Sequence, residues 1–220
     1  MKLRVILTGA TGMVGEGVLI ECLNHPEVEQ VLSVSRRPSG VQHPKLREIV
    51  HNNFHDLTPI QDQLVGYNAC FFCLGVSSVG MKEPEYRRLT YDLTLHFAQT
   101  LLPRNHNLTF CFISGVGTDS TLRSRQMWAR VKGQTENDLL QLGFKGAYMF
   151  RPGFMRATPG QQRVKGYYTF IGRLYPVLRR LFPKYVSTMQ EVGQAMIRVV
   201  QRGYPKHVLE VPDMVQLAKE

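Results

Sequence analysis

The chain has 220 residues, of which 43% are hydrophobic and 20% are charged, and it carries a formal net charge of +10. These values are those of a single folded domain and argue against an intrinsically disordered protein. No segment approaches the roughly 18 consecutive apolar residues that a transmembrane helix needs, so the sequence predicts no membrane span.

The positive charge is concentrated in the C-terminal third. Residues 151–220 contain 12 Lys and Arg against 4 Asp and Glu, whereas residues 1–150 contain 15 against 13. Such a basic region can face an anionic ligand, a membrane surface or nucleic acid, and it is also typical of a solvated face. No nucleic-acid-binding module is recognisable, so we expect a small-molecule partner or none, with peripheral membrane contact as the less favoured alternative.

The first residues, MKLRVILTGATGMVGEGV, place two cations before apolar residues, as a signal peptide does. Glycines at positions 9, 12, 15 and 17 interrupt the apolar run. We therefore expect no secretory signal and a cytoplasmic protein.

Short runs rich in β-branched and aromatic residues alternate with longer amphipathic runs. The strand-like runs are RVILTG (4–9), QVLSVS (30–35), EIV (48–50), ACFFCLG (69–75), LTFCFIS (108–114) and AYMFRP (147–152). The helix-like runs are 13–24, about 58–65, 84–102 and 124–142. Strands that are apolar on both faces and alternate with helices predict a doubly wound α/β domain, in which a mostly parallel, Rossmann-like sheet is covered on both sides.

The pattern loosens after Pro152. The following residues are rich in Gly and Pro, and they lead to a helix-like run at 188–201 and a strand-like VLEV at 208–211. We expect a single domain over 1–220, with a nucleotide-binding core at 1–152 and a short C-terminal cap at 153–220 that covers the ligand crevice.

The first strand-like run leads into a glycine-rich turn and a helix start. Gly9, Gly12 and Gly15 have the spacing GxxGxxG. Gly9 can make the tight turn, Gly12 lets the backbone approach a pyrophosphate, and Gly15 lets the helix pack on the sheet. The exposed N–H groups and the helix dipole then favour an anion, which predicts a dinucleotide site.

The end of the second strand-like run indicates which dinucleotide is bound. An NAD site typically has Asp or Glu there, whereas this chain reads VLSVSRRPSG, with Arg36 and Arg37. A guanidinium beside a 2′-phosphate gains a charge-assisted hydrogen bond of about 1.5–3 kcal/mol. We therefore predict NADP(H) as the cofactor, with NAD(H) as the alternative.

Taken in chain order, these and further motifs resemble those of the short-chain dehydrogenase/reductase superfamily, in particular its compact atypical members. The matching stretches are TGATGMVG (8–15), Asp56-Leu57, CLG (73–75), FISGVGTD (112–119), RVKGQTE (130–136) and FRPG (150–153). The likeness is strongest to a small group of TIP-thirty-like oxidoreductases and bacterial epimerase-like proteins. It implies an NAD(P)-binding Rossmann fold and an oxidoreductase or epimerase activity.

The resemblance also implies roles for individual residues. It assigns cofactor contacts in the nucleotide loop to Gly9, Thr11, Gly12, Met13, Val14 and Gly15. It assigns the adenine pocket to Asp56 and Leu57, the turn under the adenosine ribose to Leu74 and Gly75, and the turn near the nicotinamide to Pro152. Ser114 would orient a substrate carbonyl, and Lys132 would bind the nicotinamide ribose.

One catalytic residue of that superfamily is missing. Its catalytic helix reads YxxxK, in which the tyrosine exchanges a proton with the substrate, whereas this chain has Trp128 four residues before Lys132. An indole N–H donates a hydrogen bond but does not ionise near neutral pH, so Trp128 cannot be the general acid. Trp128 either fills the floor of the nucleotide pocket or stacks near the nicotinamide or the substrate.

Two functions from different classes follow. The first is an NADP(H)-dependent oxidoreductase that takes its proton from Ser114, from the substrate, or from a cap tyrosine (Tyr167, Tyr168 or Tyr175). Positioned proton transfer contributes about 10²–10⁴-fold, so hydride delivery to an activated acceptor can survive its loss. The second is a catalytically inactive protein that senses NADP(H) and regulates a partner. An epimerase that uses bound cofactor stays open, and we expect a monomer or homodimer.

Three other patterns favour structural roles. Cys70 and Cys73 form a CxxC within a strand-like run and point to opposite faces, which predicts core residues rather than a disulfide or metal site. The histidines of HNNFHD (51–56) lie at a strand end rather than on a helix, so no metal is expected.

The basic segment 167–185 has apolar residues at helical spacing, which predicts a lid helix packed on the domain or, alternatively, a face for a membrane or an anionic substrate.

Overall fold

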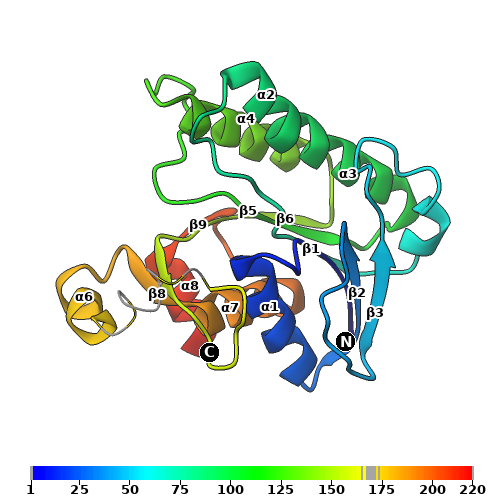
Figure 1. The fold of residues 1–220 in the computed structure, drawn as a ribbon, viewed down its shortest axis with the longest axis horizontal. Coiled ribbons are helices and arrows are strands. Elements are labelled where there is room, and N and C mark those ends of the chain that lie inside the picture. The colour runs from blue at the N-terminus through cyan, green and yellow to red at the C-terminus, as the bar shows by residue number, and fades with distance from the viewer. Residues whose placement is uncertain (1, 165, 167–171, 173, 220) are drawn as a thin grey trace.

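The computed structural model describes residues 2–164, 166, 172 and 174–219. Its centre is a sheet of seven parallel strands in the order β3-β2-β1-β4-β5-β6-β9 (Figure 1). The strands are β1 (Leu3–Thr8), β2 (Val28–Ser35), β3 (Leu46–Val50), β4 (Ala69–Phe72), β5 (Thr109–Ile113), β6 (Gly146–Arg151) and β9 (Val208–Glu210). The strand order reverses beside β1, which is the position where doubly wound sheets bind ligands. The predicted α/β fold is confirmed.

Helices cover both faces of the sheet (Figure 1). One layer consists of α1 (Met13–Asn24), α7 (Met189–Arg202) and α8 (Val211–Lys219), and the other of α2 (Glu83–Arg87), α3 (Leu93–Leu101) and α4 (Met127–Gln141). Short helical turns occur at η1 (Gln61–Leu64), η2 (Arg88–Asp92) and η3 (Leu102–Arg104). The strands are apolar on both faces because each face is covered by helices.

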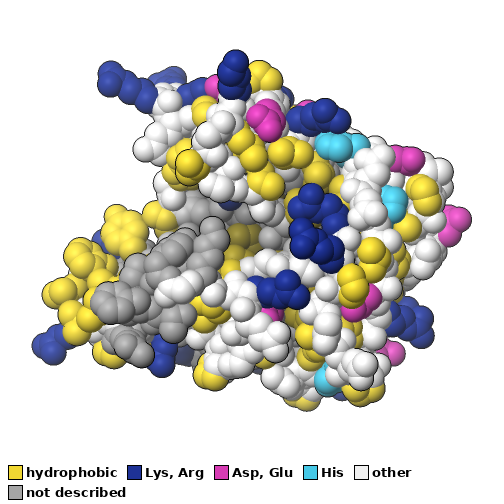
Figure 2. Space-filling view, viewed as in Figure 1, with side chains coloured by type: hydrophobic (Ala, Val, Ile, Leu, Met, Phe, Trp, Pro, Cys, Tyr) yellow, Lys and Arg dark blue, Asp and Glu magenta, His cyan; other side chains and the backbone are white. Residues whose placement is uncertain are grey.

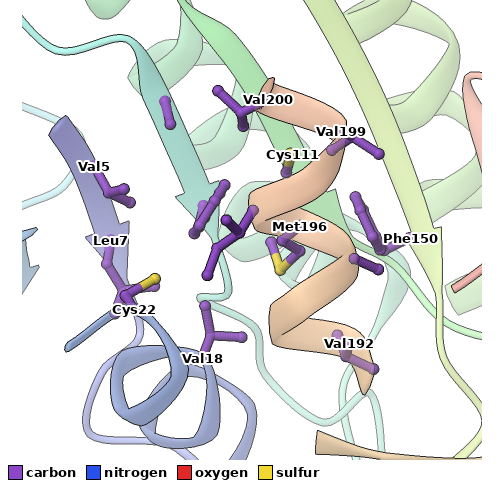
Figure 3. Close-up of a cluster of buried hydrophobic side chains, with 14 of the residues drawn as sticks. Val5, Leu7, Val18, Cys22, Cys111, Phe150, Val192, Met196, Val199 and Val200 are labelled. Atoms are coloured by element: carbon purple, nitrogen blue, oxygen red, sulfur yellow. The ribbon is translucent and has the colours of Figure 1, made fainter. Parts of the chain in front are cut away.

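The core between the sheet and the α1/α7 layer is built largely of aliphatic side chains. Figure 3 shows Met196, Val192 and Val199 of α7 directed toward the sheet, where Leu7 and Phe150 lie. All five are at most 1% exposed. Burial of this apolar surface provides the main favourable free energy for folding and fixes α7 against the sheet.

Two predicted helices differ from the observed ones. The run at 58–65 forms only the single turn η1, because the Asp56 carboxylate accepts the Thr58 N–H before it and Gly66, with φ of +82°, turns the chain after it. The run at 84–102 forms α2 and α3, joined by the π-helical turn η2.

The C-terminal region is less of a cap than the sequence predicted. Only the segment between β6 and α7 leaves the sheet layers, and it contains β7 (Phe154–Arg156), α6 (Tyr175–Leu181) and β8 (Val186–Thr188), with β7 and β8 paired in parallel. The chain then returns, because β9 pairs with β6 and α7 packs on α1. Residues 189–219 therefore belong to the Rossmann layers, and the helix α8 begins where the strand-like VLEV was expected to end.

The segment 167–185 does not bury its apolar stripe where the structure describes it. Leu174, Val177 and Leu181 are 51%, 57% and 64% exposed, so the predicted packing of a lid helix on the domain is wrong for these residues. Figure 2 shows hydrophobic side chains gathered over α6. Leu178, which shares this helical spacing, is half-buried, and Phe170, which also shares it, lies outside the described residues. Within the described ranges, no helix is both long and apolar enough to cross a bilayer.

The cysteines lie as predicted. Cys70 packs with one core layer and Cys73 with the other, and all four thiols are free. Burial raises the pKa of all four thiols above the ordinary value, as expected for small core residues.

Leu7→Ala should test the role of this core. Leu7 is fully buried, so the variant should lose about 2–5 kcal/mol in the free energy of unfolding, measured by urea denaturation. Leu181→Ala removes the same atoms from a side chain that is 64% exposed, and it should change stability by less than about 0.5 kcal/mol. Equal losses in the two variants would contradict the assignment of the core.

Candidate functional site

The glycine turn after β1 is held on two sides. Gly9 has φ of +76°, and a Cβ there would lie 2.7 Å from the carbonyl carbon of Cys73. A Cβ at Gly15 would lie 2.1 Å from the Gly9 oxygen, while the Gly12 N–H donates to that oxygen at 2.9 Å. The end of β4 and the start of α1 thus both contact the turn backbone, which agrees with the roles predicted for Gly9 and Gly15.

A cavity of about 270 Å³ opens beside this turn. Its lining residues are Gly9, Thr11, Gly12, Ser35, Arg36, Arg37, Cys73, Leu74, Gly75 and Arg163. Seven of them belong to the predicted cofactor residues, and the tertiary structure brings them together from β1, β2 and β4. The nearest atom to a Cβ at Gly12 would be the Gly9 oxygen at 3.4 Å, so this backbone is open to a ligand. Figure 2 shows Lys and Arg side chains gathered beside a hollow at the centre of the face.

Seven predicted cofactor residues are not among those that line this cavity: Met13, Val14, Gly15, Asp56, Leu57, Lys132 and Pro152. Met13 and Val14 pack against the core of the α1 layer. Leu57 is 1% exposed and packs in the other core layer. The exposed Asp56 accepts the Thr58 N–H at 3.1 Å, and hydrogen bonding from the Thr58 side chain and then from this N–H lowers the pKa of the Asp56 carboxyl. Their predicted contacts with a cofactor stay predictions.

Arg163 is a cavity residue that the sequence did not reveal. It lies in the C-terminal segment, and its guanidinium donates to the Ser39 carbonyl at 3.4 Å. The only signal in the sequence was the excess of basic residues after residue 150, which does not identify a position.

Lys132 lies on α4 with its ammonium group directed at the end of β5. Its Nζ donates to the Ser114 carbonyl. Burial lowers the pKa of Lys132 to about 8, although the carboxylate of Glu136, one turn further along α4, acts in the opposite direction. An ammonium has three donors, so the Ser114 carbonyl uses one of them.

Ser114 faces away from the open side of the site. Its hydroxyl lies 2.5 Å from Glu136 Oε1 and 3.0 Å from the Phe150 carbonyl oxygen, and the residue is only 6% exposed. The hydroxyl therefore donates into the interior of the protein. The next residue, Gly115, has no side chain to offer in its place.

The acceptor, Glu136, belongs to a buried ion pair that the sequence analysis missed. Glu136 is fully buried, and both of its carboxylate oxygens accept hydrogen bonds from Arg151 at the end of β6. Ser120 lies 3.3 Å from Glu136 Oε2, and Arg151 also reaches Glu210 at 3.3 Å. A buried carboxylate needs such partners. The spacing of Glu136 four residues after Lys132 was a possible signal.

Trp128 is half-buried and packs on the loop that follows β5. A Cβ on Gly117 would lie 3.2 Å from the indole Cη2, and Gly117 has φ of +89°. The Pro152 carbonyl accepts the Val116 N–H at 3.0 Å, which fixes the same loop to the end of β6. The indole of Trp128 thus packs against one side of the loop, and it contains no group that ionises near neutral pH.

Two other groups that the sequence singled out are a tyrosine of the C-terminal segment and the histidines of HNNFHD. Tyr175 is half-buried with Arg156 5.2 Å from its ring, and burial raises the pKa of its hydroxyl. Tyr167 and Tyr168 lie outside the described residues. His51 Nε2 lies 2.7 Å from the Asn53 and Asp56 carbonyl oxygens, and the described residues contain no group of three side chains suited to a metal.

Fungal proteins are similar to the chain in sequence. Protein fmp52, mitochondrial, of Emericella nidulans is 28% identical over 173 residues, which are 73% of this chain and 70% of that protein. Protein FMP52, mitochondrial, of Eremothecium gossypii is 26% identical, covering 99% of this chain and 98% of that protein. No protein-family model matches the chain.

Solved structures share its fold. A short chain dehydrogenase family protein from Francisella tularensis has a TM-score of 0.66 at 15% identity, covering 92% of this chain and 93% of that one. The ADP-L-glycero-D-manno-heptose-6-epimerase of Helicobacter pylori has a TM-score of 0.68 at 12% identity (99% and 81% covered). MoeE5, in complex with UDP-glucose and NAD, has a TM-score of 0.68 at 18% identity (98% and 80% covered). The chain shares the Rossmann fold of these short-chain dehydrogenase and epimerase structures.

The expectation of a cytoplasmic protein is contradicted by these relatives, because both fungal proteins are named as mitochondrial. The glycines that interrupt the N-terminal apolar run argue against a secretory signal peptide. They do not bear on a mitochondrial location.

The lowered pKa of Lys132 predicts a pH dependence of stability. Between about pH 8 and the ordinary value of 10.5, the folded protein has lost a proton that the unfolded chain keeps, so the free energy of unfolding rises with pH. Between about pH 7.5 and about pH 9.5, the free energy of unfolding of wild type should rise by about 1–2 kcal/mol relative to that of Lys132→Met, as measured by urea denaturation. The matched variant of the exposed Lys145, Lys145→Met, should show no such trend relative to wild type. A constant difference between wild type and Lys132→Met would contradict the assignment.

Proposed function

We propose that this chain binds NADP(H) and acts as an atypical short-chain oxidoreductase on a small substrate. The single observation that carries the proposal is the cavity in which the glycine turn and three arginines meet. The names of the fungal relatives support a mitochondrial location for this activity.

The residues present fit a dinucleotide. The open backbone at Gly12 and the start of α1 suit a pyrophosphate, because helix N-terminal N–H groups and the helix dipole favour an anion. Leu74 and Gly75 would lie under the adenosine ribose. Arg36 and Arg37 support a 2′-phosphate, since no carboxylate is among the described residues that line the cavity. This favours NADP(H), whereas MoeE5 was solved with NAD.

A nicotinamide cofactor, when bound, supplies or accepts a hydride. Lys132 would hold the nicotinamide ribose with the donors that the Ser114 carbonyl does not use, and Pro152 would lie near the nicotinamide. With Trp128 in the tyrosine position, Lys132 itself would be the group that delivers a proton from Nζ. Its pKa of about 8 supports this role, because a general acid works best near the operating pH.

The second candidate is a nucleotide-binding protein that is catalytically inactive and reports the NADP(H) state to a partner. A specific observation favours it: the Ser114 hydroxyl is hydrogen-bonded to buried Glu136, and the neighbouring Trp128 has no acidic proton. Of the serine, the tyrosine and the lysine of the usual catalytic set, the chain would then keep only Lys132 available, and as a group that binds the cofactor.

The 2′-phosphate assignment predicts selective loss of NADPH binding. Arg36→Ala combined with Arg37→Ala should weaken NADPH binding about 10²–10⁴-fold, because each of the two charge-assisted hydrogen bonds contributes about 1.5–3 kcal/mol. NADH binding should weaken by less than about three-fold, as measured by isothermal titration calorimetry. The control removes two exposed arginines far from the cavity, Arg88→Ala with Arg202→Ala. Equal weakening of NADPH and NADH would refute the assignment.

Replacing Trp128 should separate the two candidate functions. In an enzyme that lacks only the usual tyrosine, Trp128→Tyr should raise the rate of NADPH oxidation with aldehyde and quinone acceptors by about 10²–10⁴-fold. Trp128→Phe is the matched control and should give no such gain, since it adds no hydroxyl. Tight NADPH binding with no oxidation in wild type or in Trp128→Tyr would decide for the inactive binding protein.

A further inference from the structure

The C-terminal segment around residue 161 is attached to the phosphate-binding end of α1. Glu16, in the first turn of α1, accepts the backbone N–H of Gln162 at 2.8 Å and that of Arg163 at 2.7 Å, one on each carboxylate oxygen. The side-chain amide of Gln161 donates to the Met13 carbonyl at 2.8 Å. These contacts join parts of the chain almost 150 residues apart, so they place the segment over the start of α1.

The attachment carries a third cation to the cavity. Arg163 lines the same cavity as Arg36 and Arg37, and its guanidinium reaches the Ser39 carbonyl. No carboxylate is among the described residues that line the cavity. Three like charges around one cavity repel one another, and an anion between them relieves that repulsion.

We propose that Arg163 is a third ligand of the 2′-phosphate of NADP(H), and that Glu16 is the positioning residue that holds Arg163 in place. This inference rests on the proposed function and deepens it: cofactor selectivity comes partly from the C-terminal segment rather than from β2 alone. Binding of the cofactor and attachment of the segment to α1 are then coupled, and each strengthens the other.

The position of Arg163 favours the 2′-phosphate over the pyrophosphate. The pyrophosphate belongs at the N-terminus of α1, beside Gly12. Arg163 instead reaches Ser39, which follows Arg36 and Arg37 closely in the chain, so its guanidinium lies on the β2 side of the cavity. That is the side on which Rossmann folds hold the adenosine ribose.

Glu16 serves the structure of the segment rather than the ligand directly. Both of its oxygens are occupied by the N–H groups of Gln162 and Arg163. Glu16→Gln keeps the shape of the side chain but replaces one acceptor by an N–H₂ donor, so one of the two backbone contacts is lost.

The first experiment compares affinities for NADPH and NADH by isothermal titration calorimetry. Arg163→Ala should weaken NADPH binding about 10-fold or more. It should weaken NADH binding by less than about three-fold, because only NADPH carries the 2′-phosphate. Arg180→Ala removes an exposed arginine of the same C-terminal region that is not among the cavity residues, and it should leave both affinities unchanged. NADH binding also verifies that each variant is folded.

The outcomes distinguish this inference from the proposed function. If Arg163→Ala leaves NADPH affinity intact while Arg36→Ala with Arg37→Ala lowers it selectively, the inference is overturned and the proposed function stands. If Arg163→Ala weakens NADPH and NADH equally, Arg163 binds a shared part of the dinucleotide and the 2′-phosphate role is refuted. If wild type binds neither cofactor, the proposed function itself fails.

A second experiment tests Glu16 as a positioning residue. Glu16→Gln should weaken NADPH about 3- to 10-fold in an otherwise wild-type protein, but should add no further loss to Arg163→Ala, since both act through one guanidinium. NADPH should slow hydrogen exchange of the Gln162 and Arg163 amides in wild type and less in Glu16→Gln. Glu29→Gln, an exposed charge change at the other end of β2, is the control. Additive losses in the double variant would overturn the coupling.

Discussion

The close contact of three backbone segments at Gly9 is the constraint on which the site depends. The turn after β1 has the end of β4 on one side and the start of α1 on the other, both nearer than any side chain would permit. This contact sets Gly12, at the start of α1, and Leu74 and Gly75, after β4, beside the cavity. An anion site made of backbone groups needs such fixed geometry, because the individual dipoles are weak and act together only when aligned.

A second constraint is the buried ion pair beside Ser114. The buried pair of Glu136 and Arg151 joins α4 to the end of β6, and it holds the hydroxyl of Ser114. Removing one partner of such a pair leaves an uncompensated buried charge, so the pair fixes this region firmly. The same region presents the Ser114 carbonyl to Lys132, and Gly117 lies against the indole of Trp128. Of Ser114, Trp128 and Lys132, the residue with a group that titrates near neutral pH is therefore Lys132.

The C-terminal part of the chain contacts both of these regions. The C-terminal segment leaves the sheet after β6, contacts α1 at Glu16, and rejoins the layers as α7 and β9. It thus contributes a cation to the nucleotide cavity as well as core residues to the domain. Sequence reasoning treated residues 153–220 as one cap because their glycines and prolines obscure periodicity. The apolar face of α7 is buried only because α1 and the sheet lie against it.

The sequence by itself determined the seven strands of the sheet and the glycine turn, because hydrophobic periodicity and glycine spacing are local properties of the chain. The tertiary structure alone decided that Ser114 faces a buried carboxylate, that Arg151 neutralises it, and that Arg163 joins Arg36 and Arg37. Each of these depends on contacts between residues far apart in the chain, and a single sequence carries no record of which distant side chains meet. Direction and burial of a side chain are set by packing, and packing was the part that local patterns could not supply.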